Sequence, residues 1–348
     1  MSNGIKIILR ALTDSAMIRS KRGIVVLILQ DNLDGVKIYK GKQYVKDTFT
    51  ISNKAIIEKC FTKYAVNTLK VVCYSESISE ALTKLNNDKF NYLSCPSATS
   101  DSDKKLIADF IKEQRESNNI LVHAVLNKYK ADHEGIISFD NDSVTTDLEL
   151  TGAEYCVDVA CQIATVGFDR SLTGLLVNDV INASKIEDID TVTEAGGICL
   201  YYDHDLEGYV FSDGVNSKTT IKDNEKDVLK KIRICEIFDM VRDDLKVSFK
   251  KSYRGKYGNS YNRRKLIRDA FNLYFKTLQK QGVLNEDEEC SCWLNVERTR
   301  AYLEAKNVDT SDMSDEEVLK KDVDNNLFLK GRIYALDTTD KLEFELNY

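Results

Sequence analysis

The first part of the chain alternates continuous apolar runs with stretches of helical spacing. The apolar runs are rich in leucine and β-branched residues and lack polar alternation, a pattern typical of strands covered on both faces. The intervening stretches space their apolar residues for one helix face. The pattern predicts strands at 23–29, 69–74, 90–95 and 120–126, with helices at 53–64, 77–87 and from about Asp101. This order predicts an α/β domain with a parallel sheet and crossover helices.

A further helix and a hairpin are predicted to complete this domain. Residues 151–166 carry a buried stripe of small and β-branched residues at helical spacing. The segment 198–211 has two short apolar runs separated by a polar turn, which is typical of a hairpin. We place the end of the α/β domain near Asn224.

The pattern changes after Asp227. Two long amphipathic helices are predicted, and the second one ends at Gly282. A strand-like stretch at 292–305 follows, then a short helix that begins with the capping box Ser314 to Glu317. Two final strands are expected at 327–336 and 341–348. The second domain is therefore expected to be α+β.

Both ends of the chain are predicted to be strands without a partner in their own domain. The last eight residues alternate apolar and polar positions with a period of two, and the stretch 4–12 is a further strand candidate. A strand at a chain end can add to the open sheet edge of a neighbouring molecule. The apolar residues of these two arms are Ile5, Ile7, Leu9, Leu342, Phe344, Leu346 and Tyr348. The expected divisions are an N-terminal arm (1–22), an α/β domain (23–224), a C-terminal domain (225–340) and a C-terminal arm (341–348).

Composition limits the class of protein. The chain has 348 residues, 43% of them hydrophobic, which is enough for two packed cores. Its net charge of -7 argues against a protein that coats nucleic acid or anionic lipid. The nine cysteines form no disulfide framework and indicate a reducing compartment. The N-terminal stretch has no signal-peptide pattern, so we expect synthesis in a cytoplasm without export by that route.

Motifs for catalysis or cofactor binding are not found. No glycine-rich phosphate loop follows the first strand, and the three histidines form no paired metal motif. Cys290 and Cys292 lie beside an acidic run, but no second ligand pair is within the usual spacing. We therefore expect no catalytic residues, no metal site and no cofactor.

A basic segment at 248–268 offers two interpretations. It contains no acid and interleaves Lys and Arg with Phe and Tyr, a composition that can follow a nucleic-acid backbone. The segment 308–325 is rich in acids, and opposed charge patches on one chain also suit head-to-tail self-assembly. We favour self-assembly and keep nucleic-acid binding as the alternative. The residues expected to contact a tube or a neighbouring subunit are Lys250, Lys251, Arg254, Lys256, Arg263 and Arg264.

The sequence resembles the contractile tail sheath proteins of bacteriophages and of phage-tail-like particles such as R-type bacteriocins, including diffocin-like sheaths. Each matching stretch is weak alone, but their order along the chain is specific. The stretches are 11–29, 152–173, 213–220, 231–245 together with 252–284, and the closing 327–346.

The resemblance implies a subtilisin-like α/β domain and a C-terminal domain whose sheet is completed by strand exchange between subunits. The accepting edge would lie near 293–303 and 327–336. The subtilisin-like label brings no protease activity, because the chain lacks the nucleophile and histidine motifs of a catalytic triad.

The resemblance also implies a structural role. The subunit would polymerise helically around an inner tube and contract to drive that tube through a target cell envelope. Its partners would be further copies of itself, the inner tail tube protein, and baseplate and terminator or collar proteins, with no nucleic acid and no direct membrane contact. It would assemble in the bacterial host cytoplasm and then form part of the tail of a released phage or phage-tail-like particle.

Overall fold

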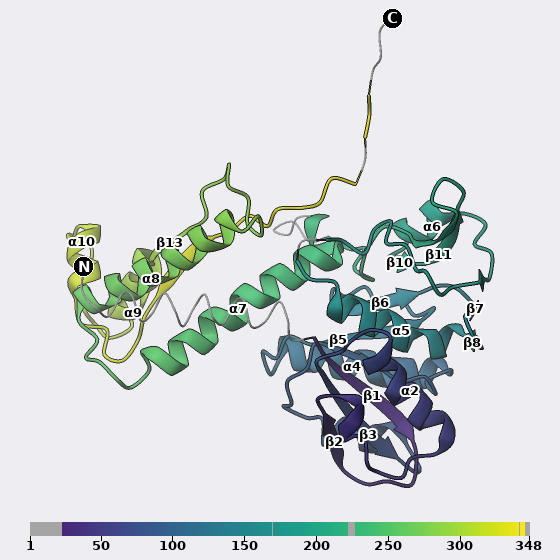
Figure 1. The fold of residues 1–348 in the computed structure, drawn as a ribbon. Helices are drawn as coiled ribbons and strands as arrows, with labels where there is room; N and C mark the ends of the chain where they lie inside the picture. The colour runs from purple at the N-terminus through teal and green to yellow at the C-terminus, as the bar shows by residue number, and fades with distance from the viewer. Residues whose placement is uncertain (1–22, 169, 222–226, 341, 345–348) are drawn as a thin grey trace, which may run out of the picture. The chain divides into compact units, whose positions relative to one another are not determined.

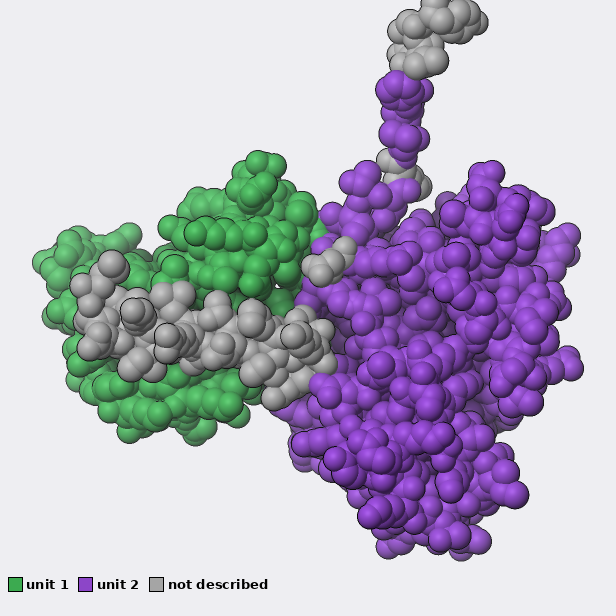
Figure 2. Space-filling view, viewed as in Figure 1, with its two compact units in different colours: residues 1–18, 237–336 green, residues 19–236, 337–348 purple. Residues whose placement is uncertain are grey.

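The structure is a computed structural model that describes residues 23–168, 170–221, 227–340 and 342–344. The chain forms two compact units (Figure 2): unit 1 contains 1–18 and 237–336, and unit 2 contains 19–236 and 337–348. The division falls at Glu236, inside one helix, because Ile232 at the start of that helix packs in the core of unit 2. The arm residues Ile5, Ile7, Leu9, Leu346 and Tyr348 lie outside the described residues.

Unit 2 is built on a seven-stranded sheet with the order β10-β6-β5-β4-β1-β3-β2 (Figure 1). Neighbouring strands are parallel except for β2, which pairs antiparallel with β3. The predicted parallel α/β sheet is thus confirmed. The strands are β1 (Ile24–Gln30), β2 (Val36–Tyr39), β3 (Thr68–Tyr74), β4 (Tyr92–Ser94), β5 (His123–Asn127), β6 (Ile136–Phe139) and β10 (Gly197–Ile198).

Helices cover both faces of this sheet, and this explains why the strand sequences are continuously apolar. Val25, Leu27 and Leu29 of β1 belong to one core cluster, whereas Val26 and Ile28 belong to another. Side chains of a strand alternate between faces, so both faces of β1 are buried. The first cluster includes residues of α2 (Ile51–Thr62) and α5 (Gly152–Thr165), and the second includes residues of α3 (Ile78–Lys84) and α4 (Asp101–Glu116).

Smaller elements complete unit 2. The predicted hairpin is confirmed as β11 (Leu200–Asp203) and β12 (Gly208–Phe211). A three-stranded sheet was not expected, because strands of two or three residues are too short to show a period. It consists of β7 (Ser143–Thr145), β8 (Glu149–Thr151) and β9 (Asn182–Ala183), and the remaining short helices are η1 (Lys42–Tyr44), α6 (Ile189–Glu194) and η2 (Asp227–Lys230).

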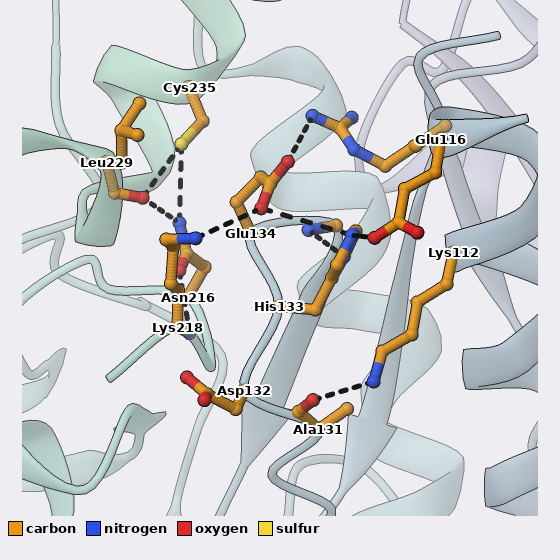
Figure 3. A network of polar contacts seen from close by, with 12 residues as sticks. Lys112, Glu116, Ala131, Asp132, His133, Glu134, Asn216, Lys218, Leu229 and Cys235 are labelled. Carbon is orange, nitrogen blue, oxygen red and sulfur yellow. Dashed lines mark hydrogen bonds and ion pairs between the residues drawn. The ribbon is translucent and has the colours of Figure 1, made fainter. Parts of the chain in front are cut away.

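A polar network holds the loop before β6 against the segment 216–220 (Figure 3). The Ser217 hydroxyl donates to the His133 carbonyl over 3.0 Å. The Glu134 carboxylate lies between the His133 imidazole and the Lys218 ammonium group. Its Oε2 is 3.9 Å from His133 Nε2 and 3.9 Å from Lys218 Nζ. Burial alone would raise the pKa of Glu134, but the positive charges around it lower the pKa.

Asp132 makes this network sensitive to acid. Its Oδ1 accepts hydrogen bonds from the Thr219 and Thr220 N–H groups, each over 2.8 Å. Burial opposes ionisation, yet these bonds to the charged form hold the pKa well below its usual range.

A carboxyl whose folded-state pKa is depressed contributes stability above its unfolded pKa of about 4 and loses it as the pH falls further. We therefore expect the unfolding free energy to decrease below about pH 4, and Asp132→Asn to reduce that decrease by at most about 1 kcal/mol, since the side chain is exposed. Urea unfolding of both proteins at pH 7 and pH 3.5 measures the difference. An unchanged pH dependence in the variant would show that other carboxyls are responsible.

Unit 1 contains two long helices and a small sheet. The elements are α7 (Ile232–Ser252, which begins in unit 2), α8 (Tyr261–Lys280), β13 (Ser291–Leu294), α9 (Val296–Glu304), α10 (Asp315–Lys320) and β14 (Leu329–Arg332). Both predicted long helices are confirmed, and so is the capping box that starts α10 at Ser314. Tyr274 of α8 donates its buried hydroxyl to Asp244 Oδ2 of α7 over 2.7 Å.

One prediction for this unit is wrong. The strand expected over 292–305 is a strand only to Leu294, and the rest is α9. The Asn295 side chain accepts a hydrogen bond from the Arg298 N–H, so it caps a helix at the point where the strand ends. The apolar residues of 296–304 also fit a helical stripe, and the strand interpretation ignored this spacing.

Candidate assembly interface

The small sheet of unit 1 has one edge that a side chain covers and one edge that no described residue covers. β13 pairs antiparallel with β14, with Trp293 opposite Lys330. On the other side of β13, the Asn272 side chain of α8 bonds both backbone groups of Cys292, accepting from its N–H over 2.7 Å and donating to its carbonyl over 3.0 Å. The amide of Asn272 thus takes the place that a further strand would occupy beside β13.

No described strand pairs with the outer edge of β14. The Asn295 N–H donates to the Phe328 carbonyl over 2.9 Å, so Phe328 and its alternate neighbours direct their backbone groups toward β13. Leu329, Gly331 and Ile333 consequently direct theirs to the opposite side. Among the residues that the structure describes, no hydrogen bond reaches the backbone groups of these three residues. A row of such groups, left free by the described part of the chain, is a template for another strand.

Gly331 allows β14 to lie close to β13. A Cβ at this position would come within 2.8 Å of Cys292 Cβ and 2.9 Å of the Ser291 carbonyl oxygen. Any side chain here would push the strands apart and shift the open edge. A glycine in the short sheet is therefore required for this geometry.

The C-terminal segment leaves two large apolar side chains in solvent. Leu342 is 88% exposed and Phe344 is 73% exposed, at alternate positions of the chain. Residues 342–344, the described part of the expected C-terminal strand, are not assigned to a strand in this single subunit. Exposed side chains of this size, two residues apart, suit a segment that becomes buried on binding.

The base of this segment is held to its own unit. Lys231 Nζ forms an ion pair with Asp337 and lies 3.7 Å from Asp340 Oδ2. Burial alone would lower the pKa of Lys231, but the hydrogen bond to Asp337 and the two carboxylate charges raise it. Asp337 and Asp340, which precede the C-terminal segment, are thereby held to Lys231 of unit 2.

Five of the six basic residues expected at an interface are on the surface. Lys250 and Lys251 lie in the last turn of α7, Arg254 and Lys256 lie in the turn before α8, and Arg263 lies in the first turn of α8. The Arg263 guanidinium stacks over the Tyr257 ring at 5.1 Å.

Arg264 differs from the expectation. Its side chain is 3% exposed, and it donates to the Lys321 carbonyl over 3.0 Å. Burial lowers the pKa of this guanidinium, although the charge of Asp322 opposes that change. Arg264 thus ties α8 to the segment after α10 and is not available to a partner, because helical periodicity turns it inward while Arg263 faces outward.

Features of other protein classes are not found in the part of the chain that the structure describes. Among these residues, no group of three or more His, Cys, Asp or Glu is arranged to hold a metal ion. Cys290 and Cys292 are buried. No helix in the described ranges has the length and apolarity needed to cross a bilayer.

Two matches to family models decide the assignment. Residues 74–217 match the phage tail sheath protein central domain, and residues 224–342 match the phage tail sheath C-terminal domain. The chain belongs to the phage tail sheath family. The second match ends at Leu342, so it includes the small sheet with the open β14 edge.

This sheath chain is similar to a curated sheath protein over nearly its whole length. It is 27% identical to the tail sheath protein of Clostridium phage phiCD119, over 98% of each chain. It is also 24% identical to the phage-like element PBSX protein XkdK of Bacillus subtilis, over 63% of this chain and 50% of that protein. The sheath chain is therefore a structural subunit of a contractile phage-type tail.

Solved structures share its fold. The sheath tail protein Lin1278 from Listeria innocua superposes with a TM-score of 0.72 and 15% identity, covering 83% of this chain and 93% of that one. The helical sheath of the anti-feeding prophage in its contracted state gives a TM-score of 0.67 and 12% identity, covering 94% of this chain and 93% of that one. None of these likenesses supports the nucleic-acid interpretation of 248–268.

Proposed function

We propose that this sheath chain polymerises helically around an inner tube, and that the polymer shortens to drive the tube through a target cell envelope. The proposal is supported by family membership and by the likeness to a sheath solved in a contracted helical state. The observation that carries it is the outer edge of β14, which no strand of the described residues pairs with and which is therefore a template for a strand from a neighbouring subunit.

Strand exchange between subunits would use this edge. One neighbour would supply the C-terminal arm with Leu342, Phe344, Leu346 and Tyr348, and another would supply the N-terminal arm with Ile5, Ile7 and Leu9. Because Asn272 covers β13, the arm that pairs directly with a resident strand would pair with β14, and the second arm would pair with the first.

Energetics favour many weak links over one strong link. Burying Leu342, Phe344 and Leu346 contributes roughly 4 to 9 kcal/mol at about 1.5 to 3 kcal/mol each. Association costs about 4 to 15 kcal/mol. One arm alone is thus marginal, but a subunit that both donates and accepts arms is held by several links at once.

The further partners would be the inner tube protein and the baseplate and terminator or collar proteins. A likeness to a chain of the anti-feeding prophage baseplate assembly supports this placement. The α/β unit would be a subtilisin-like scaffold without catalysis, and the particle would be a phage tail or a phage-tail-like bacteriocin such as a diffocin, assembled in the bacterial cytoplasm. The surface residues Lys250, Lys251, Arg254, Lys256 and Arg263 would contact the tube or an adjacent subunit.

Electron microscopy of the purified chain tests this proposal. At increasing protein concentration we expect tubes or striated helical polymers in negative stain. A titration with a labelled oligonucleotide is the parallel measurement, because the proposal predicts no binding. A chain that stays monomeric at every concentration and shifts the oligonucleotide would favour the nucleic-acid alternative instead.

A further inference from the structure

A pocket of about 750 Å³ lies in unit 1 at the turn that joins α7 to α8. Phe249, Leu266 and Leu327 are among the apolar residues that line it, and Arg254 and Lys256 are among the basic ones. Arg254 and Lys256 are exposed and form no ion pair within the described residues. We call the exposed cationic side of this pocket, formed by Arg254, Lys256 and Arg263, the basic mouth.

An acidic turn lies beyond the other end of α8. Glu286, Asp287 and Glu288 are exposed and make no ion pair with any residue that the structure describes. The turn is nevertheless fixed, because the Gln279 side-chain amide donates to the Asn285 carbonyl over 2.8 Å and to the Glu288 carbonyl over 2.9 Å. These two hydrogen bonds hold the acidic turn to α8.

The basic residues at the start of α8 are unfavourable for the helix itself. The first turn has no acid and carries Arg263, although this end of a helix is already positive. The last turn carries Lys280, which suits the negative end, and Glu286 to Glu288 follow beyond that turn, where the dipole has little effect. The stability of α8 therefore explains the position of neither cluster.

The two clusters cannot neutralise each other within one copy. α8 has 20 residues and is therefore about 30 Å long. Direct ion pairs require about 4 Å. A second copy, placed so that its acidic turn meets the basic mouth of the first, would bring opposite charges together and align the two dipoles head to tail.

The other acidic stretch of unit 1 is partly neutralised internally. Asp315 lies 3.3 Å from Arg300, and Glu316 lies 2.7 Å from Lys320. Asp324, which also lines the pocket, pairs with Lys306. Three of the seven acids of 308–325, the segment that the sequence suggested as the negative partner, are thus paired within the subunit, whereas Glu286, Asp287 and Glu288 pair with no described residue.

We infer that the acidic turn of one sheath subunit docks at the basic mouth of a second copy of this chain, in a head-to-tail contact between their C-terminal units. The inference rests on the proposed function, since it needs a polymer of this chain, and it names the partner of the basic surface. Such a contact is heterologous and can be repeated along a ring or a helix. The opposite charges of the acidic turn and the basic mouth would set the register of neighbouring subunits and make assembly sensitive to salt.

Charge reversal followed by charge exchange tests the contact. The mouth variant carries Arg254→Glu and Lys256→Glu, the turn variant carries Glu286→Lys and Glu288→Lys, and the exchange variant carries all four changes. We expect each of the first two to raise the critical concentration for assembly about tenfold or more, measured by sedimentation. The exchange variant should regain near wild-type assembly, and an equimolar mixture of the mouth and turn variants should co-assemble.

A matched control changes the same number of charges elsewhere. Asp312→Lys with Asp205→Lys, both at exposed positions, should leave the critical concentration within about twofold of wild type, and circular dichroism should show that every variant is folded. Failure of the exchange variant and of the mixture to recover assembly would overturn the head-to-tail contact. A wild-type chain that forms no polymer would instead count against the proposed function itself.

Discussion

Replacing Leu329 with proline is expected to abolish polymer formation while the monomer stays folded. Leu329 is the first residue of an edge strand, and its N–H points away from β13, a position where proline is tolerated in a monomer. In the polymer, proline would remove a ladder hydrogen bond, at a cost of about 1 to 3 kcal/mol per contact, and would place its ring in the path of the incoming strand. The critical concentration should therefore rise by about tenfold or more, and by about 100-fold at the upper value.

The matched control is Leu329→Ala, which also shortens the side chain but keeps the N–H. It should assemble with a much smaller loss than the proline variant. Deleting residues 341–348 tests the donor side of the same contact, and the truncated chain should be a folded monomer. Normal assembly of the proline variant would show that the β14 edge is not the acceptor, and normal assembly of the truncated chain would remove the C-terminal arm from the account.

The Asp158→Ala variant is expected to lose about 3 kcal/mol or more of unfolding free energy. Asp158 is a fully buried carboxylate on α5. It binds three groups, of which one belongs to α2 and two belong to the residues just after α2. Lys59 Nζ lies 2.6 Å from Oδ2, and Lys63 Nζ and the Tyr64 hydroxyl lie 3.0 and 2.5 Å from Oδ1. Removing the carboxylate leaves the Lys59 ammonium and the Tyr64 hydroxyl without this acceptor, and it leaves Lys63 with Asp179 alone. Urea unfolding at pH 7 measures the loss.

Asp179 provides the comparison for this prediction. It pairs with Lys63 from a position 39% exposed and does not contact the other two groups. Asp179→Asn should therefore cost less than about 1 kcal/mol, as exposed ion pairs usually do. Equal losses in the two variants would mean that the buried carboxylate does not hold α2 to α5.

The sequence predicted the elements whose signal is local. The core strands appear as continuous apolar runs, and the spacing of Ser314 and Glu317 is sufficient to mark the start of α10. The sequence did not resolve 292–305, because a four-residue strand followed by a nine-residue helix offers no long period in either register.

The candidate site was predictable only in part. The alternate apolar residues Leu342 and Phe344 indicated an arm that needs a partner, and the structure leaves both exposed. The resemblance placed the accepting edge near 293–303 and 327–336, but the sequence could not show that Asn272 covers β13, because this is a contact between distant parts of the chain. Arg264 was grouped with the surface cations because composition alone does not show which side of α8 each residue occupies.

An electron cryomicroscopy structure of the assembled polymer tests the central claim most directly. The account predicts that the backbone groups of Leu329 and Gly331 bond to a strand from a neighbouring subunit, and that residues 342–344 lie in a sheet of another copy. A polymer in which the β14 edge remains unpaired and both chain ends lie against their own subunit would contradict it.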